Sequence, residues 1–480
     1  MVAATNALLF LALSASVAQA HLASEVRARH LVERQAPASS ASSSSARATA
    51  TATRTRAATS ATSAPTGTGN VPSSPLASLS KIGTATTAEA TQPLPSTFQA
   101  GATPPIARAP KLPSIANLNP ANYPALDRIP PIDSPEVQQW IKEVDLSKAP
   151  NIPRTQLGAC SNSSNSQAVT DASKNGWWTC GGYTRATDVT FCPNKNEWGA
   201  SFDDGPSPYT PRLLNFLQAQ NLKSTFFIVG SRAISRPEMV QTEYMLGHQL
   251  SVHTWAHSTL TTLSNEEIVA ELGWTKKIIQ DITGVTPNTM RPPYGDIDDR
   301  VRYISLKMGL RPVIWTSYNG QTFDTRDWQI GGGVVSATDA YNNFNGFLTQ
   351  TSSQLSTGFI VLAHDLYQQS VDLAVDYVLP NVINAGQLHI KTIAECLGEG
   401  LSGAYIETAD NSTQNPTQTS SQVPGASGSG FVSNVAASQT SKSGANSSQQ
   451  SQGAGGTNGA SKVSSGLALV AISLVLAFAA

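Results

Sequence analysis

Short runs rich in β-branched and aromatic residues alternate with helix-length amphipathic runs between about residues 198 and 396. Ser224–Val229 ends in four consecutive apolar residues, which is typical of a strand buried on both faces. Thr210 and Pro211 provide an N-cap and a first-turn proline for a helix that reaches about Gln220. Strand and helix in strict alternation predict a parallel α/β sheet.

The same pattern places further elements along this part of the chain. The expected strands are Gly199–Phe202, Gln249–Val252, a run near Thr289, Arg311–Trp315, Gly358–Ala363 and Leu388–Ile390. The expected helices are Met239–Leu246, a helix that a capping box opens at Ser264 and Gly284 ends, Arg300–Met308, Ala337–Ser352 and Val371–Ala385. With roughly seven units, a β/α barrel is the first interpretation of the fold, and a doubly wound open sheet is the second.

The composition separates a folded core from two tails. Only 13% of residues are charged, whereas a globular domain has about 25%. Residues 21–103 and 406–458 are rich in Ser, Thr, Ala, Gly and Pro, so we expect disordered, O-glycosylated stalks there. Residues 104–191 are expected to pack on the barrel, which occupies residues 192–405. The net charge of −1 excludes a globally basic nucleic-acid-binding protein, and no obligate protein partner is inferred.

Both ends of the chain are typical of targeting signals. Residues 1–20 run from a hydrophobic stretch into Ala18-Gln19-Ala20, which predicts a secretory signal peptide; an uncleaved anchor is the alternative. Residues 459–480 end in an uncharged apolar tail behind a polar spacer, which predicts a glycosylphosphatidylinositol (GPI) signal. The expected attachment site is Asn458, with Gly453–Gly456 as alternatives. We therefore expect a protein attached outside the cell to the plasma membrane or the wall.

Four cysteines in an oxidising compartment allow three pairings. Cys192 precedes the first expected barrel strand and Cys396 follows the last, so joining them would link the two ends of the core. That pairing leaves Cys160 with Cys180; the reverse assignment or a free thiol is the alternative. Predicted N-glycosylation sites are Asn162, Asn411 and Asn446.

Two adjacent carboxylates, Asp203 and Asp204, follow the first expected strand. Their mutual repulsion is unfavourable unless a cation or a basic partner neutralises them. Gly205 and Pro206 end the strand, so both side chains can reach the mouth of the barrel. An ordinary Asp-Asp-Gly turn is the alternative interpretation.

His253 and His257 follow the strand Gln249–Val252 and stand four positions apart. That spacing puts both imidazoles on one face of a helical turn, an arrangement by which two histidines hold one metal ion. With one carboxylate they would form a three-ligand site that keeps positions open for water and substrate. His248 and His389 lack clustered partners, so we assign them to structure.

Three later segments carry further reactive side chains. Arg291-Pro292-Pro293-Tyr294-Gly295 predicts a rigid loop whose arginine can bind a carboxylate and whose tyrosine amide can face an oxyanion; a proline-stiffened loop is the alternative. Asp324-Thr325-Arg326-Asp327-Trp328 adds carboxylates and an aromatic wall. His364 and Asp365 come at the end of the strand Gly358–Ala363.

Together these segments resemble the polysaccharide deacetylases of carbohydrate esterase family four, the NodB homology domain, and among them the lipid-anchored fungal chitin deacetylases. The matching segments are Ser201–Pro206, His253–His257, Arg291–Gly295, Asp324–Trp328 and Leu362–Asp365. The resemblance covers about residues 192 to 396, with Ser201 where threonine is commoner. It implies a distorted parallel β/α barrel with fewer than eight units.

The resemblance also implies the site chemistry. Asp204, His253 and His257 would hold one divalent metal ion, zinc or cobalt. Asp203 would be the general base that takes a proton from water, and Arg291 would pair with it.

The remaining implied roles concern the leaving group and the substrate. His364 would protonate the leaving amine, and Asp324 rather than Asp327 would hold it charged and oriented. The expected substrate- and acetate-binding residues are Asp203, Tyr294, Trp328 and Leu362.

A metal-dependent chitin deacetylase at the fungal cell surface or wall is therefore the predicted function, with chitin or chitin oligomers as substrate, and chitosan and acetate as products. An acetylxylan esterase on the same scaffold is one alternative. A catalytically inactive module that binds wall polysaccharide is another. A structural mannoprotein would explain the stalks but not the five segments.

Overall fold

The computed structural model describes residues 71, 73–83 and 92–409. The expected signal peptide at residues 1–20, the GPI signal at residues 459–480 and most of the stalk at residues 406–458 lie outside these residues. The same holds for Asn411, Asn446 and Asn458. Those features stay predictions.

The core is a parallel sheet whose strands come from successive strand–helix units. Its order is β2-β3-β4-β5-β6, with bounds Ser201–Asp203, Thr225–Ile228, Gln249–Val252, Thr289–Met290 and Arg311–Pro312. A second parallel sheet has the order β10-β1-β9, with bounds His389–Lys391, Glu197–Gly199 and Phe359–Ile360. A hairpin is formed by β7 (Ser317–Tyr318) and β8 (Gln321–Thr322). The single strand expected at Gly199–Phe202 is thus divided at Ala200 between the two sheets.

Hydrogen bonds between short irregular segments close these sheets into a barrel. On one side, the Asp203 amide donates to the Ala363 carbonyl (2.9 Å), and the Asp365 amide donates to the Asp203 carbonyl (3.1 Å). On the other side, the Thr316 amide donates to the Ile360 carbonyl (3.0 Å). The chain therefore folds as the expected distorted parallel barrel, and the open-sheet alternative is wrong.

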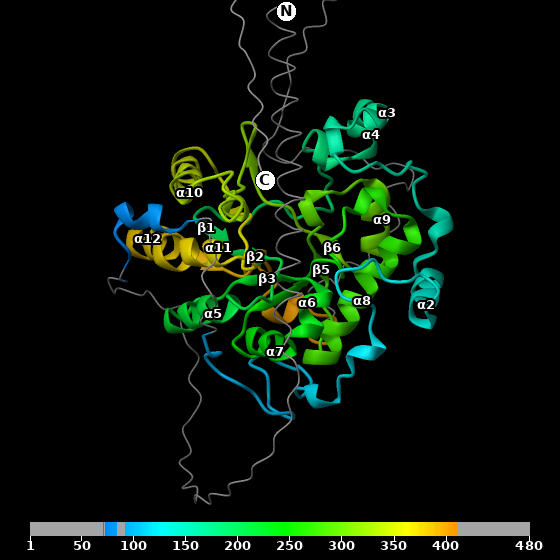
Figure 1. Cartoon of the computed structure of the whole chain (residues 1–480), viewed down its shortest axis with the longest axis horizontal. Coiled ribbons are helices and arrows are strands. Elements are labelled where there is room, and N and C mark those ends of the chain that lie inside the picture. The colour runs from blue at the N-terminus through cyan, green and yellow to red at the C-terminus, as the bar shows by residue number, and fades with distance from the viewer. Residues whose placement is uncertain (1–70, 72, 84–91, 410–480) are drawn as a thin grey trace, which may run out of the picture. The chain divides into compact units, whose positions relative to one another are not determined.

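Helices connect and cover the strands (Figure 1). Those that follow the strands are α5 Thr210–Ala219, α6 Gly230–Ser235, α7 Pro237–Met245, α8 Asn265–Thr283, α9 Asp299–Lys307, α10 Ala337–Ser353, α11 Gln368–Leu373, α12 Leu379–Ala385 and α13 Ile393–Cys396. A π-helical turn, Ala374–Val378, joins α11 to α12. The predicted capping box is present at Ser264, and Gly284 ends α8 in the left-handed region with a φ of 83°.

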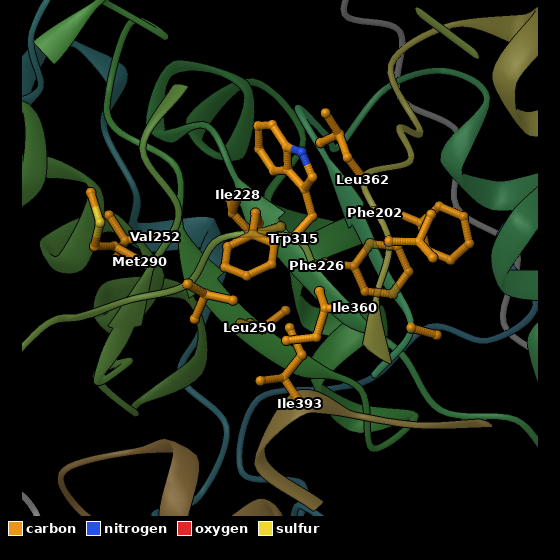
Figure 2. Packing of buried hydrophobic residues seen from close by; sticks show 14 of the residues in the cluster. Phe202, Phe226, Ile228, Leu250, Val252, Met290, Trp315, Ile360, Leu362 and Ile393 are labelled. Atoms are coloured by element: carbon orange, nitrogen blue, oxygen red, sulfur yellow. The ribbon is translucent and has the colours of Figure 1, made fainter. Parts of the chain in front are cut away.

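The two faces of the strands differ in polarity because side chains alternate along them. One face packs apolar side chains: the rings of Phe202 and Phe226 lie side by side on neighbouring strands, 5.9 Å apart at their centroids (Figure 2). On the other face, Thr225 donates to Gln249 Oε1 (3.0 Å), and both side chains are buried. Asp203 lies two residues after Ser201 and therefore shares this polar face.

The segment before the barrel packs on its outside through aromatic side chains. Its helices are α2 Pro135–Val144, α3 Ser166–Thr170 and α4 Ala172–Asn175. Trp140 of α2 lies edge-on to Trp274 of α8, with ring centroids 5.6 Å apart. Trp177 is buried, and its indole nitrogen donates to Asp296 Oδ1 (2.9 Å). These contacts make residues 104–191 continuous with the barrel.

The expectation of a disordered segment over residues 21–103 is wrong for the part that the structure describes. Val71 is buried, and its amide and carbonyl bond to the Asn384 side chain at 2.8 and 2.9 Å. Leu79 is buried as well, and Ser78 Oγ lies 2.6 Å from the Tyr377 hydroxyl. A few well-placed apolar residues anchor this segment, although its average composition resembles that of a stalk.

Both disulfides have the favoured pairing. Cys192 and Cys396 are buried and bonded, with their Cα atoms 5.3 Å apart, and they close a sequence separation of 204 residues. Cys160 and Cys180 close a separation of only 20 residues. In the chain-entropy account, the longer loop stabilises the fold by about 5 kcal/mol and the shorter by about 3 kcal/mol.

We therefore expect replacement of Cys192 and Cys396 by serine to lower the free energy of unfolding by roughly 2 kcal/mol more than replacement of Cys160 and Cys180. Urea unfolding of the two double variants, followed by circular dichroism, measures this difference. Equal losses, or a larger loss from the shorter loop, would contradict the explanation by chain entropy.

Candidate active site

Asp203 and Asp204 stand where β2 ends, and the backbone turns sharply between them and the next residues. Asp204 has a φ of 78°, and its carbonyl accepts a hydrogen bond from Arg232 Nη1 of α6 (2.7 Å). A Cβ at Gly205 would lie 2.3 Å from Asp365 Oδ2, so only glycine fits there. This turn brings both carboxylates to the carboxyl end of the barrel.

Arg291 lies beside Asp203, as expected. Its Nη1 donates to Asp203 Oδ1 (2.6 Å) and to Ser201 Oγ (3.0 Å), and the guanidinium lies 4.0 Å from the ring centroid of Phe227. The arginine is fully buried. Burial lowers the pKa of Arg291, while the charge and the hydrogen bond of Asp203 raise it. The pair therefore fixes the direction of the Asp203 carboxylate.

Asp204, His253 and His257 converge on one point. Both imidazole Nε2 atoms lie 3.1 Å from Asp204 Oδ1, and the three possible ligand atoms all lie within 4.8 Å of one another. Asp204 Oδ1 is buried and accepts no hydrogen bond from the described residues. His253 Nδ1 lies 2.7 Å from the Arg291 carbonyl, which fixes the tautomer that points a lone pair at Asp204. This donor set fits a divalent metal ion.

Electrostatics at Asp204 favour a cation. Burial raises the pKa of Asp204, but the two adjacent histidines, His257 foremost, and the charge of His364 lower it well below its ordinary value. The group is therefore ionised inside the protein. A buried carboxylate of this kind is unfavourable unless a positive charge accompanies it.

The helical turn expected for the two histidines is wrong. β4 ends at Val252, and residues 253–257 form no helix. Thr254 and His257 have φ values of 64° and 55°, in the left-handed region where a residue other than glycine is strained by about 1–3 kcal/mol. The two imidazole rings lie with their centroids 4.9 Å apart and are tilted by 56° to each other.

The expectation that Asp324 holds His364 is also wrong. His364 Nδ1 lies 2.7 Å from Asp327 Oδ1, and the His364 amide donates to Asp327 Oδ2 (2.9 Å). Asp324 instead accepts the Arg326 amide (2.8 Å) in its own turn. Arg326 has a φ of 61°, in the left-handed region. The chain turns at this residue, and Asp327 rather than Asp324 reaches the imidazole of His364.

Burial lowers the pKa of His364, but the charge and hydrogen bond of Asp327, with smaller effects from Asp204 and Asp203, raise it to about 10. His364 is therefore an imidazolium at neutral pH. His364 lies next to Asp203 where the barrel closes, since the two pair as neighbouring residues of parallel segments.

Besides Asp203, three other residues are predicted to contact the substrate, and they lie around this centre. The Tyr294 ring packs edge-on to His257, with centroids 4.7 Å apart. The Trp328 amide donates to Asp327 Oδ1 (2.9 Å). Leu362 forms a parallel β-bridge with Asp324. Trp328 and Leu362 each expose less than a tenth of their surface.

Asp296 and Glu271 were not anticipated from the sequence, and Asp365 was named there beside His364 without a role. Asp296 accepts the Thr261 amide (2.8 Å) and the Thr179 hydroxyl (2.7 Å). Asp365 is buried beside Gly205, and burial raises its pKa to about 7. Glu271 of α8 bonds to the histidine loop. No motif links Asp296 or Glu271 to the residues that they contact, so spacing gave no signal for these two acids.

Comparison with known proteins agrees with this geometry. A family model described as polysaccharide deacetylase matches residues 191–313. Chitin deacetylase 1 of Cryptococcus neoformans is 55% identical over 355 residues, which is 73% of this chain and 73% of that protein. Chitin deacetylase of Amylomyces rouxii is 34% identical and covers 57% of this chain and 64% of its own length.

A solved structure, the chitin deacetylase from Colletotrichum lindemuthianum, has 25% identity and a TM-score of 0.41, covering 47% of this chain and 97% of that one. The assignment to a family therefore rests on the relatives found by sequence and not on this structure. They confirm the resemblance to the polysaccharide deacetylases. The chain therefore belongs to the polysaccharide deacetylase family and is a hydrolase that removes acetyl groups.

Proposed function

We propose that this protein is a chitin deacetylase, which converts N-acetylglucosamine units of chitin into glucosamine units and releases acetate. The observation that carries the proposal is the three-ligand centre of Asp204, His253 and His257, with Asp203 on one side and a charged His364 on the other. The 55% identity to a protein named chitin deacetylase 1 supports chitin as the substrate.

Asp204, His253 and His257 would hold one divalent ion, zinc or cobalt. When bound, such an ion makes water acidic enough to attack at neutral pH and polarises the acetamide carbonyl. His253 keeps its Nδ1 on the Arg291 carbonyl, so its Nε2 faces the centre.

Asp203 is the proposed general base. Arg291 occupies Oδ1, whereas Oδ2 lies 4.0 Å from His253 Nε2 and so faces the centre. Asp203 Oδ2 would take the proton of the attacking water. Because Arg291 keeps the carboxylate from rotating, the proton acceptor is already aligned when substrate arrives.

His364 is the proposed general acid. Asp327 holds Nδ1, which leaves Nε2 to donate its proton to the nitrogen that departs as an amine. The Tyr294 amide would stabilise the negative charge on the former carbonyl oxygen. Trp328 and Leu362 would enclose the acetyl methyl group.

We place the enzyme outside the cell, at the membrane surface or the wall, with residues 192–405 as the catalytic domain and a GPI anchor at its end. The support is the sequence of the two chain ends. Among the described residues, no helix is long and apolar enough to cross a membrane.

Metal-loaded full-length protein should release acetate from chitin oligomers, and mass spectrometry should show a loss of acetyl groups. Chelation should abolish the release, and Asp203→Asn should reduce it roughly 10²- to 10⁴-fold because the proton acceptor is lost. Asn215 lies on α5, and its side chain donates to the Pro93 and Pro211 carbonyls rather than to a residue of the site, so Asn215→Ala serves as a control with unchanged rate. Activity that survives both chelation and Asp203→Asn sinks the mechanism.

The same protein tested on O-acetylated xylan separates the substrates. We expect slower or no acetate release there. Faster acetate release from xylan than from chitin oligomers would identify the protein as an acetylxylan esterase. Acetate release from neither polymer would favour the interpretation as an inactive binding module.

Asp327→Asn should move the alkaline limb of the kcat/KM profile to lower pH. The raised pKa keeps His364 protonated up to about pH 10, and activity falls as pH rises through it. Without the Asp327 charge, burial lowers that pKa against only the smaller effects of Asp204 and Asp203, so the limb should shift by more than about one pH unit. Asp324→Asn is the matched control, because Asp324 does not bond to His364; an equal shift in both variants would contradict the assignment to Asp327.

A further inference from the structure

The loop that carries His253 and His257 is held by a carboxylate from outside the site. Glu271, in the middle of α8, is fully buried. Its Oε2 accepts the amides of Trp255 (2.7 Å) and Ala256 (2.9 Å), and its Oε1 accepts the Ser258 hydroxyl (2.7 Å). One side chain therefore binds three successive parts of the chain around His257.

This loop lacks the internal hydrogen bonds that would support a helix. β4 ends before His253, and two of the loop's residues are in the left-handed region. Strained residues persist only where their surroundings fix them. The loop's carbonyls are bound by α6, since the Gly230 amide donates to Thr254 (2.9 Å) and the Ser231 amide to Trp255 (3.1 Å). Glu271 of α8 binds two of its amides.

We propose that Glu271 is a positioning residue of the metal centre: its carboxylate fixes the loop so that His253 and His257 face Asp204. The inference rests on the proposed metal site. Glu271 does not touch the three ligand atoms, and its effect passes through the backbone between the two histidines. Releasing the loop would let the imidazoles separate, and a site of three ligands depends on both.

Two substitutions of Glu271 separate the effect of its side-chain length from the effect of its charge. Glu271→Gln keeps the reach, because its amide oxygen can accept both backbone amides and its NH₂ group can donate to Ser258. Glu271→Asp keeps the charge but is one methylene shorter. If the hydrogen bonds matter, the Asp variant should bind zinc more weakly than the Gln variant. If the buried charge matters, the Gln variant should bind zinc more weakly.

The test is zinc binding to metal-free full-length protein, measured by calorimetry. Glu271→Ala and Glu271→Asp should weaken zinc binding roughly 10- to 100-fold, as loss of a residue that orients a metal-binding histidine does. Glu271→Gln should stay within about threefold of the wild type. The visible absorption of bound Co²⁺, which reports ligand geometry, should change in the first two variants alone.

Glu243→Ala is the matched control. Glu243 is a second fully buried glutamate, on α7, and its oxygens accept no hydrogen bond within the described part of the chain. It should bind zinc like the wild type, even if its stability changes.

The possible outcomes distinguish a failure of the proposed metal centre from a failure of the role proposed for Glu271. A wild type that binds no metal refutes the metal centre itself. A wild type that binds zinc, with folded Ala and Asp variants of unchanged affinity and Co²⁺ absorption, overturns the role of Glu271 alone. If those variants do not fold, Ser258→Ala decides, because it removes one of the three bonds; we expect severalfold weaker zinc binding, and unchanged binding overturns the inference.

Discussion

The ionised carboxylate of Asp204, buried within reach of two imidazoles, is the constraint around which the site is built. Both Nε2 atoms lie 3.1 Å from one of its oxygens, and this oxygen accepts no hydrogen bond from the residues the structure places. Such a group is stable only beside positive charge. Asp204 and His257 both have backbone conformations in the left-handed region. These conformations belong to the two loops that bring the three possible ligands of a cation together.

The closure of the barrel serves the chemistry as well as the fold. Asp203 exchanges backbone hydrogen bonds with the segment that carries His364, so the proposed base and the proposed acid are neighbours in the same ladder. Each is then held by its own partner, Arg291 on one side and Asp327 on the other. The proton acceptor and the proton donor therefore cannot drift apart without breaking the barrel.

The sequence predicts this fold and most of this site because their signals are local. Alternation of strands and helices gave the barrel, and clusters after strands gave the Asp203, His253 and His364 positions. The choice of Asp324 over Asp327 failed because a single left-handed residue between them decides which carboxylate faces the histidine. Glu271 and Asp296 were missed because each binds backbone and side-chain groups outside any motif that contains it, which no spacing rule reports.

Asp296 also decides how much of the chain the enzyme needs. One of its oxygens receives Trp177 and Thr179 from the loop that the Cys160–Cys180 bond closes, and the other receives Thr261. It stands two residues after Tyr294, in the wall of the catalytic centre. A fragment trimmed to begin at the family match would strip two donors from this carboxylate, so the smallest autonomous catalyst starts well upstream of that boundary.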